Sequence, residues 1–549
     1  MSPAHRQTTA NSRNGSLAGT GQLLRFMLRR DRIRFPAWVL GLSLMLAYFA
    51  NALGLVLDEQ SLATFAAFAA NPVMALIGGP GYGFEAITLG RFLVGMYGVF
   101  LMIGAGLMGI TTISRHTRAE EQSGRAELIR ANAVGRHAQL AAALALAILM
   151  NLALAVLMAL VFMASPAQAP APSAFLFSCG VAAVGLVFCA VAALAVQLSA
   201  YSRATSGLAG AVLAASFMTR GLGDMSAAQG GNLSWLSWLS AFGWSQHTAP
   251  LVLDRWWPLL LSLTAAVLLS LAGFALQSRR DLAAGILPDR SGGQRAPGWL
   301  GSPLALAFRL QRSALAWWSF ALLLSGIVFG AFVQPMAENA AGMPEELLAV
   351  FGGAQGMVEG YLGFMGLYLA ILVSVFAILS ILSLRGEEQA VRAEPILAAS
   401  VSRAGWLASW VLVTVLGSLW LMLLGGVGNG IGSGLSTGDW TLLARATLGH
   451  LVQTPSVWVL AGLATALYGF LPRLAALAWA VFAYCSALGF FGEMLQLDQP
   501  VLDSSVFLHI GQYPAAEIDW TAVGGLSLLA VTLIALGATG FRRRDLITA

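Results

Sequence analysis

Apolar runs of about 20 residues recur along the whole chain, and short polar segments separate them. A run of this length is enough to cross the hydrocarbon core of a bilayer as an α-helix. The pattern therefore predicts an all-α polytopic membrane protein with about 12 transmembrane helices. The predicted spans cover residues 36–57, 92–113, 138–163, 174–196, 204–219 and 259–276 in the first half, and 315–333, 362–384, 406–427, 456–471, 474–491 and 522–540 in the second.

A polar sequence recurs in the two halves. Residues 120–136 read EEQSGRAELIRANAVGR, and residues 387–403 read EEQAVRAEPILAASVSR. The sequence RRDL also ends each half, at 279–282 and again at 543–546. Six spans per half is an even number, so both halves face the same way and form a parallel repeat. The expected organisation is a disordered cytoplasmic tail (1–20), a first six-span half (21–287), a linker (288–302) and a second six-span half (303–549).

The composition agrees with this interpretation and excludes one activity. Hydrophobic residues make up 58% of the chain and charged residues only 10%, whereas a soluble domain carries about 25% charged residues. All 30 basic residues are arginine, with no lysine. A P-loop of the form GxxxxGK[ST] needs a lysine to reach the nucleotide phosphates. The chain is therefore not expected to be an enzyme that hydrolyses ATP at a site of that kind.

Arginine placement predicts the orientation. Most arginines fall in alternate loops, and the opposite set of loops holds only four: Arg91, Arg220, Arg255 and Arg445. Because arginine is enriched in cytoplasmic loops, both termini are predicted to be cytoplasmic in a bacterial inner membrane. The basic character follows from this topology, so no nucleic acid partner is expected.

Each repeated polar loop starts with acids and ends with arginine. On a helix, Glu121 and Arg125 would be i,i+4 neighbours, as would Glu388 and Arg392, in the favourable order. Each loop is therefore predicted to contain a short helix at the membrane surface. Such a helix could simply tether two spans in solvent. Its duplication instead favours a symmetric partner that docks at both copies.

The first repeated loop resembles a segment of a known family of membrane proteins. Glu120, Glu121, Gly124 and Glu127, followed by the VGR element at 134–136, resemble the coupling-helix segment of bacterial ABC exporter permeases of the type-2 (type V fold) class. The segment ALIGGPGYGFEAITLGRF (75–92) is similar to actinobacterial exporters of the polyketide-antibiotic (tetronasin-type) multidrug efflux family. The second copy departs from the pattern, with Val391 in place of the glycine and Pro395 in place of the leucine.

The resemblance implies a division of labour between subunits. Two copies of a separate ATP-binding cassette subunit would dock on the two coupling helices and would hold the ATP and Mg, while this chain would bind no cofactor. Amphipathic elbow helices would lie at 23–34 and 304–315, against membrane lipids. The residues implied in coupling are Glu120, Glu121, Gln122, Arg125 and Glu127, with Glu387, Glu388, Gln389, Arg392 and Glu394 in the second copy.

The resemblance also implies a path for a hydrophobic small-molecule substrate, lined by the second and fifth spans of each half. Aromatic and methionine side chains adapt to varied apolar ligands, although the same side chains could equally serve helix packing or contact lipid. The candidates are Met96, Tyr97, Phe100, Met102, Phe217, Met218, Phe364, Tyr368, Phe482, Tyr484 and Phe490.

These observations favour the permease of an ATP-driven efflux transporter that exports hydrophobic or amphipathic compounds such as antibiotics. The alternatives are a proton-coupled twelve-span secondary carrier and an ABC-type exporter of a lipid or glycolipid. A proton-coupled carrier usually needs ionisable residues within the membrane, and the predicted spans have none near their centres. The scattered histidines His247, His450 and His509 predict no metal site.

Overall fold

The structure is a computed structural model that describes residues 15–56, 72–131, 134–281, 284–287, 295–338, 356–492 and 497–545. The first 14 residues of the predicted tail and residues 288–294 of the predicted linker lie outside the described residues. The chain divides into two compact units, Met1–Gly292 and Gly293–Ala549. Each unit is described by itself below.

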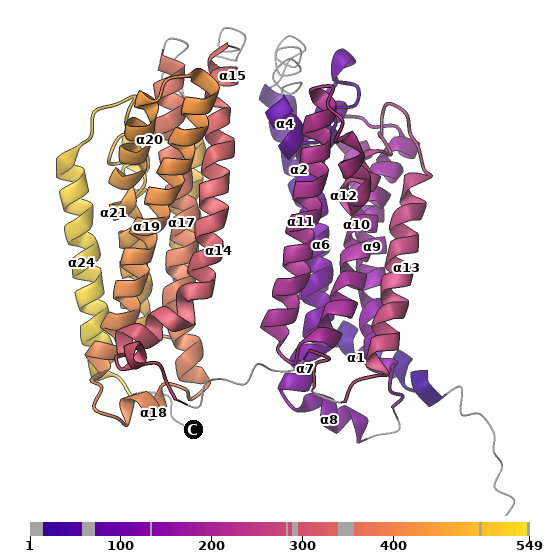
Figure 1. Ribbon diagram of the computed structural model, residues 1–549, viewed down its shortest axis with the longest axis horizontal. Coiled ribbons are helices and arrows are strands. Elements are labelled where there is room, and N and C mark those ends of the chain that lie inside the picture. Colours follow the sequence, from indigo (N-terminus) through magenta and orange to yellow (C-terminus); the bar gives the residue numbers. More distant parts are fainter. Residues whose placement is uncertain are drawn as a thin grey trace, which may run out of the picture. The chain divides into compact units, whose positions relative to one another are not determined.

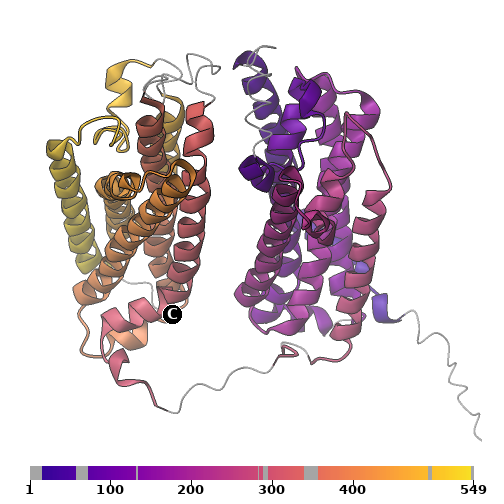
Figure 2. The same cartoon turned by 45° about the horizontal axis from the view of Figure 1, so that its top comes forward.

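Unit 1 is a bundle of long helices that stand side by side (Figures 1 and 2). Apolar side chains from these helices form one continuous core. The long helices are α1 (Thr20–Arg30), α2 (Arg34–Val56), α6 (Gly98–His116), α9 (Ala138–Ala164), α10 (Ala171–Leu198), α11 (Ser202–Ala228) and α13 (Pro258–Gln277), and the short ones are α4 (Pro72–Ile77), α5 (Leu89–Phe92), α7 (Arg118–Gln122), α8 (Arg125–Arg130) and α12 (Ala241–Gln246).

Unit 2 is a second bundle with its own apolar core. Side-chain caps begin three of its helices. Ser302 accepts a hydrogen bond from Ala305 N, Ser402 accepts one from Gly405 N, and Asp519 accepts from Thr521 N and Ala522 N. Its helices are α14 (Pro303–Ala331), α15 (Val333–Glu338), α17 (Met357–Gln389), α18 (Glu394–Leu397), α19 (Arg403–Thr437), α20 (Thr441–Val452), α21 (Thr454–Phe470), α22 (Leu477–Phe491), α23 (Gln499–Leu502) and α24 (Trp520–Arg543).

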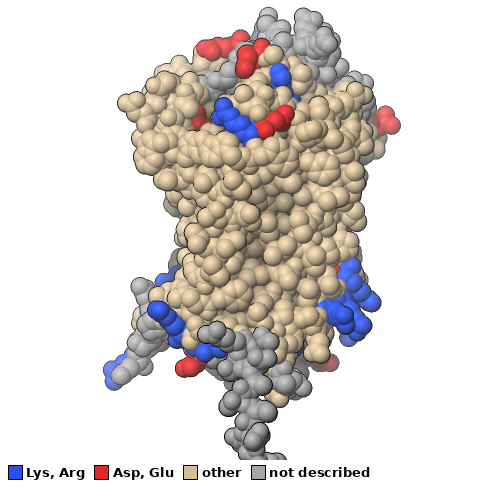
Figure 3. Space-filling model, turned by 90° about the vertical axis from the view of Figure 1, so that its right-hand side faces the viewer, with Lys and Arg blue, Asp and Glu red and all other residues tan. Residues whose placement is uncertain are grey.

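Ten helical stretches among the described residues are long and apolar enough to cross a membrane. They coincide with ten of the twelve predicted spans. The other two predicted spans, the fifth of each half, are helices of a different kind. Helix α11 has 27 residues but carries Arg220 and Asp224, and α22 is apolar but has only 15 residues. On the face of unit 1 that Figure 3 shows, charged side chains gather towards the two ends and the band between them is uncharged.

The predicted elbows differ between the units. Helix α1 is a separate amphipathic helix, with Leu23 and Met27 buried and Arg25 and Arg29 exposed on its other side. In unit 2 the elbow predicted at 304–315 is the beginning of α14, which continues without interruption to Ala331. The predicted second elbow is therefore the first part of α14 rather than a helix of its own.

Glycines bring α14 and α19 into close contact. A Cβ atom added at Gly330 would meet the backbone of Asn429, and one added at Gly432 would meet the backbone of Ile327. Small residues at such crossings allow two backbones to approach closely and gain packing energy where no hydrophobic effect acts between helices. The pair α14–α19 is one of the principal helix contacts within unit 2.

Candidate functional site

The first repeated loop forms two short helices at the end of unit 1 that lies at the bottom of Figure 1. Helix α7 follows directly after α6, and α8 begins after a turn at Gly124. Gly124 has a φ of +74°, which is the left-handed region that glycine adopts without steric cost. This turn separates α7 from α8, so the loop does not form one continuous helix.

Glu120, the first acid of this loop, is buried between two arginines. Its Oε2 accepts a hydrogen bond of 2.9 Å from Arg125 Nε, and its Oε1 accepts one from Arg30, the last residue of α1. The contact with Arg125 holds α8 against α7. The contact with Arg30 connects the loop to the amphipathic helix α1.

Glu121, the second acid, is turned into the protein and pairs with an arginine from the end of unit 1. It accepts two hydrogen bonds from Arg280, of 2.7 and 3.0 Å, and one of 2.7 Å from Arg118. Only 3% of the Glu121 side chain is exposed. Arg280 in turn donates from Nε to Gln197 Oε1 at 2.6 Å, so every group in this buried cluster has a partner of suitable chemistry.

The second repeated loop contains the corresponding pair. Glu388 accepts two hydrogen bonds from Arg544, of 2.7 and 2.6 Å, and a third of 2.7 Å from the hydroxyl of Tyr468. The guanidinium of Arg544 also lies over the rings of Tyr468 and Phe541, at 4.9 and 5.0 Å from their centroids, where the ring faces attract a cation.

We call Glu121–Arg280 and Glu388–Arg544 the anchor pairs. Each anchor arginine is the second arginine of the RRDL sequence that ends its half. The arginine that ends each repeated loop contacts the same place: Arg136 donates to the Arg280 carbonyl at 3.0 Å, and Arg403 donates to the Arg544 carbonyl at 2.8 Å. In each unit, two separate hydrogen-bonded contacts thus join the polar loop to the segment that follows the last helix.

The expected i,i+4 pairs do not form, so this part of the prediction is wrong. Arg125 pairs with Glu120 rather than Glu121, and Arg392 pairs with Glu387 at 2.8 Å rather than with Glu388. The physical reason is the turn between acid and arginine, which breaks the helix.

That turn has the same backbone conformation in both copies. Val391 stands where the first copy has Gly124, and it has a φ of +59°. A β-branched residue is a genuine outlier in the left-handed region. Because the second loop keeps this turn despite the valine, the loop geometry is held by its contacts rather than by backbone preference.

The loop tips carry charges that stay ionised. A hydrogen bond from Arg125 to Glu120 raises the pKa of Arg125, and one from Arg392 to Glu387 raises the pKa of Arg392. Both arginine side chains are more than half exposed. Gln122, Glu127, Gln389 and Glu394 are also exposed. The surface of each loop is therefore polar and accessible, although Glu120, Glu121 and Glu388 are buried.

The predicted path residues fall into separate groups within each unit. In unit 2, α17 and α22 bring three of them together: the Phe490 ring lies 6.3 Å from that of Phe364 and 5.8 Å from that of Tyr368. Phe482 packs on Trp479, and the exposed Tyr484 shares a 2.7 Å hydrogen bond with Ser504.

In unit 1, the predicted path residues Met96 and Tyr97 lie in a π-helical turn, Leu93–Tyr97, that precedes α6. Such turns frequently occur at functional sites. Tyr97 lies 6.5 Å from Phe100, measured between ring centroids. The remaining path candidates of this unit are packed differently: Met102 is buried, Phe217 packs on Phe242, and Met218 is half-buried.

Sequence reasoning missed a buried ion pair in α11. The predicted fifth span ended at residue 219, whereas the helix continues to Ala228 and includes Arg220 and Asp224. Their charged atoms lie 3.4 Å apart, and Arg220 also donates to the carbonyls of Ala75 and Ile77. The spans were predicted from uninterrupted apolar runs. Arg220 and Asp224 interrupt such a run, so the part of α11 that carries them was not recognised as helix. The pair lies beyond the predicted span, towards the end of α11, so it does not place a charge at a span centre.

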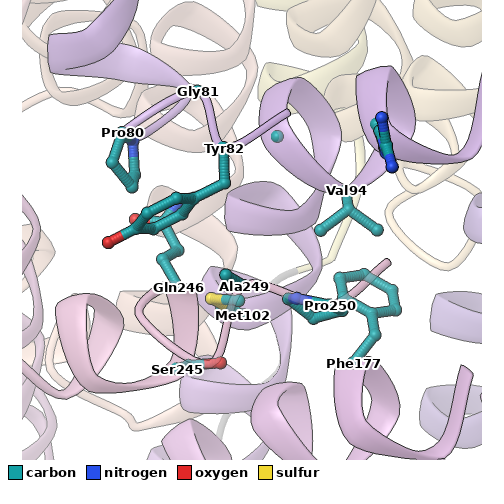
Figure 4. Close-up of a pocket in the computed structure, with 12 residues that line it drawn as sticks. Pro80, Gly81, Tyr82, Val94, Met102, Phe177, Ser245, Gln246, Ala249 and Pro250 are labelled. Carbon is teal, nitrogen blue, oxygen red and sulfur yellow. The ribbon is translucent and has the colours of Figure 1, made fainter. Parts of the chain in front are cut away.

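The segment 80–82, which follows the α4 carbonyls that Arg220 binds, lines part of a small cavity (Figure 4). Tyr82, Gln246 and Ser245 lie on one side of it, and Val94 and Phe177 lie on the other. His247, next to Gln246, is held between the Tyr82 hydroxyl and Ser237 Oγ, each at 2.8 Å. Burial and the nearby charge of Arg255 lower the pKa of His247 to about 4. Among the described residues, no group of histidines, cysteines and acids could hold a metal ion.

Comparison with known proteins identifies the family. The family described as "Multidrug efflux system permease Rv1217c, C-terminal domain" matches residues 21–276 and 300–542. The multidrug efflux system permease protein Rv1217c of Mycobacterium tuberculosis (strain ATCC 25618 / H37Rv) is 37% identical over 546 residues, which cover 98% of this chain and 97% of that protein. These matches support an efflux permease and do not single out the tetronasin-type family. With its membrane-spanning helices and this full-length similarity, the chain belongs to the family of multidrug efflux system permeases.

Proposed function

We propose that the chain is the permease of an ATP-driven exporter of hydrophobic or amphipathic small molecules. Two separate ATP-binding subunits dock on the two polar loops and supply the hydrolysis of ATP with Mg. The chain crosses the bacterial inner membrane twelve times, with both termini in the cytoplasm. Helices α11 and α22 complete six spans in each of two parallel repeats.

The anchor pairs are the observation that carries this proposal. Each unit ties an exposed polar loop to the end of its last helix through a buried, multiply bonded carboxylate. A loop that only tethers two spans does not need a buried ion pair, whose removal from water is costly. A loop that must transmit force does need a stiff connection to the transmembrane helices. The absence of lysine agrees, because the site of ATP hydrolysis then lies on another chain.

We further propose different roles for the predicted coupling residues. Glu121 and Glu388 position the loops from inside, and the exposed Gln122, Arg125, Glu127, Gln389, Arg392 and Glu394 form the surface that a partner would contact. The substrate path remains assigned to the second and fifth spans. The aromatic group Phe364, Tyr368 and Phe490 is its best-defined part, because α17 and α22 meet there.

The first experiment is affinity purification of the chain from its native membrane, with mass spectrometry and stoichiometry of the proteins that accompany it. An ATP-binding subunit at two copies per chain, with ATPase activity, is expected. A chain that purifies alone in all mild detergents, and whose transport does not need ATP, would overturn the proposal.

The Arg220–Asp224 pair keeps the proton-coupled carrier as a second candidate, because buried ionisable groups in membrane helices often serve proton transfer. Both side chains are, however, already paired with each other, and Arg220 also bonds two carbonyls. Efflux of a fluorescent hydrophobic dye from vesicles separates the two. Export that continues with ATP after the proton gradient is dissipated supports the exporter, and export that stops supports the carrier.

A further inference from the structure

A large apolar groove runs along the outside of unit 1 between α9 and α13, with α10 as its floor. Its volume is about 680 Å³, within the range of roughly 300–1,000 Å³ typical of ligand sites. The walls are almost entirely hydrocarbon. They include Leu144, Ile148, Leu186, Leu263, Val267 and Leu271.

The groove has the length of one membrane leaflet. Its walls extend from His137 to Ile148 on α9 and from Leu263 to Phe274 on α13. At 1.5 Å per residue each wall is about 17 Å long, which is about half of a 30 Å hydrocarbon core. His137 lies just before α9, and Phe274 lies in the last turn of α13, so the groove belongs to the leaflet on the side of the repeated loop.

The end of the groove nearest that loop is polar and basic. His137 lines it and bonds Gln277 Oε1 at 2.9 Å. Arg136 and Arg279, next to these residues in the chain, are exposed. A short segment, Gly15–Leu17, crosses here, because the Ser16 carbonyl accepts a hydrogen bond of 2.9 Å from His137 N.

Unit 2 places its last helix differently. There α24 packs against both α21 and α19. In unit 1 the last helix, α13, packs chiefly against α10 and leaves the space beside α9 to the groove. The groove is therefore not a necessary product of packing six helices.

We propose that this groove binds one acyl chain of an anionic phospholipid, whose phosphate lies near Arg136 and Arg279. Hydrocarbon walls suit an acyl chain and exclude a polar ligand, and the groove ends at the depth where that leaflet ends. Basic groups at the cytoplasmic ends of membrane helices bind anionic headgroups. The site lies on α9 and α13, away from the proposed substrate path on α6 and α11, and it does not depend on whether ATP drives the transporter.

The test is native mass spectrometry of the delipidated full-length chain, titrated with phosphatidylglycerol or with phosphatidylcholine of the same chain length. One phosphatidylglycerol per chain is expected to bind more tightly than phosphatidylcholine. Arg279→Gln should weaken the binding of phosphatidylglycerol about fivefold and leave the binding of phosphatidylcholine unchanged. Arg543→Gln, at the exposed arginine that holds the same place as Arg279 in the second RRDL sequence, is the matched control.

A second pair of variants tests the groove itself. Ala145→Phe fills the groove and should weaken the binding of both lipids at least tenfold. Leu152→Phe should leave their binding unchanged, because Leu152 lies on the same side of α9 but beyond the outer end of the groove. Val267→Phe fills the groove from the opposite wall and serves if Ala145→Phe lowers the melting temperature. Equal binding of both lipids would contradict the proposal that the bound lipid has an anionic headgroup. Unchanged binding in both filled variants would overturn the site and show contact with bulk lipid only.

Discussion

At the scale of single residues, the anchor pairs show how a charged sequence motif can serve the interior of a protein. Two neighbouring glutamates in each loop have different tasks: the first binds the arginine five residues later, and the second binds an arginine more than 150 residues away. A buried carboxylate without its arginine is strongly unfavourable. The pair therefore fixes the loop to one position.

Removing one member of an anchor pair should destabilise the protein. Arg280→Met leaves Glu121 buried with Arg118 as its only arginine, so we expect a loss of about 3 kcal/mol and weaker retention of the ATP-binding subunit. The exchange Glu121→Arg with Arg280→Glu should recover part of both losses. Thermal unfolding in detergent and co-purification measure them.

Exposed acids provide the control for this prediction. Glu127→Arg and Glu394→Arg should weaken docking while the melting temperature stays unchanged. If these variants bind normally and only the anchor variants lose the subunit, the loop tips are not the contact surface.

Val391 gives a prediction of the opposite sign. A left-handed backbone costs a residue other than glycine roughly 1–2 kcal/mol, so Val391→Gly should raise the free energy of unfolding by about 1 kcal/mol. The reciprocal change, Gly124→Val, should lower it by a similar amount. Chemical denaturation in detergent compares the two, and a destabilised Val391→Gly variant would show that the loop is not held in this turn.

His247 predicts a dependence on pH. Burial, followed by the charge of Arg255, lowers its pKa to about 4 from an ordinary value of 6.5. The folded protein therefore disfavours the protonated imidazole, and stability falls as the pH drops from about 6.5 towards 4, by on the order of 2–3 kcal/mol. Melting temperatures of the parent and of His247→Gln should converge over this range. The exposed His509→Gln variant should follow the parent at every pH.

At the scale of helices, the length of the apolar runs predicted most of the spans. Helical segments that carry charged residues were not recognised from the same pattern. The runs gave α2, α9 and α10 to within a few residues because their apolar stretches are uninterrupted. Helix α11 was predicted, but its predicted end came too early. Arg220 and Asp224 interrupt the apolar run, and they are accommodated in the helix because they pair with each other and because Arg220 bonds the distant α4 segment. The second elbow was predicted as a helix, but its continuity with the following span was not, because residues 303–331 form α14 without a break.

The crossing of α14 and α19 supplies a test at this scale. Gly432→Leu would push a side chain into the backbone of α14 near Ile327, so we expect a loss of at least 1–3 kcal/mol, as for other overpacked contacts. Gly525→Leu on α24 is the matched control, because nothing lies within 4 Å of the position where its Cβ would be. A Gly432→Leu variant that melts like the parent would contradict this close contact.

At the scale of the whole chain, each unit contains both members of its own anchor pair. We therefore expect residues 1–292 and 293–549, produced as two chains in one cell, to insert separately and to retain the unit-specific contacts. Extraction and melting of each piece measure this. Aggregation of both pieces, with normal behaviour of the intact chain, would show that neither unit is stable by itself.

The sequence repeat singled out the two polar loops, but it could not indicate which distant residues hold them in place. Both the EEQ motif and the RRDL motif were visible as repeats, yet nothing in local spacing indicated that Glu121 meets Arg280 or that Glu388 meets Arg544. Such pairings depend on how the helices return through the membrane. Composition and periodicity carry little information about contacts between distant segments, and the groove beside α9 was invisible for the same reason.

The distance along the chain between the members of each anchor pair has a consequence for biosynthesis. Glu121 is made 159 residues before Arg280, and Glu388 is made 156 residues before Arg544. Each loop consequently leaves the ribosome before its anchor arginine has been made, and it reaches its final position only after the last helix of its half has been inserted. A docking surface that depends on this position matures at the end of insertion, so an incomplete half would present no finished surface to a partner.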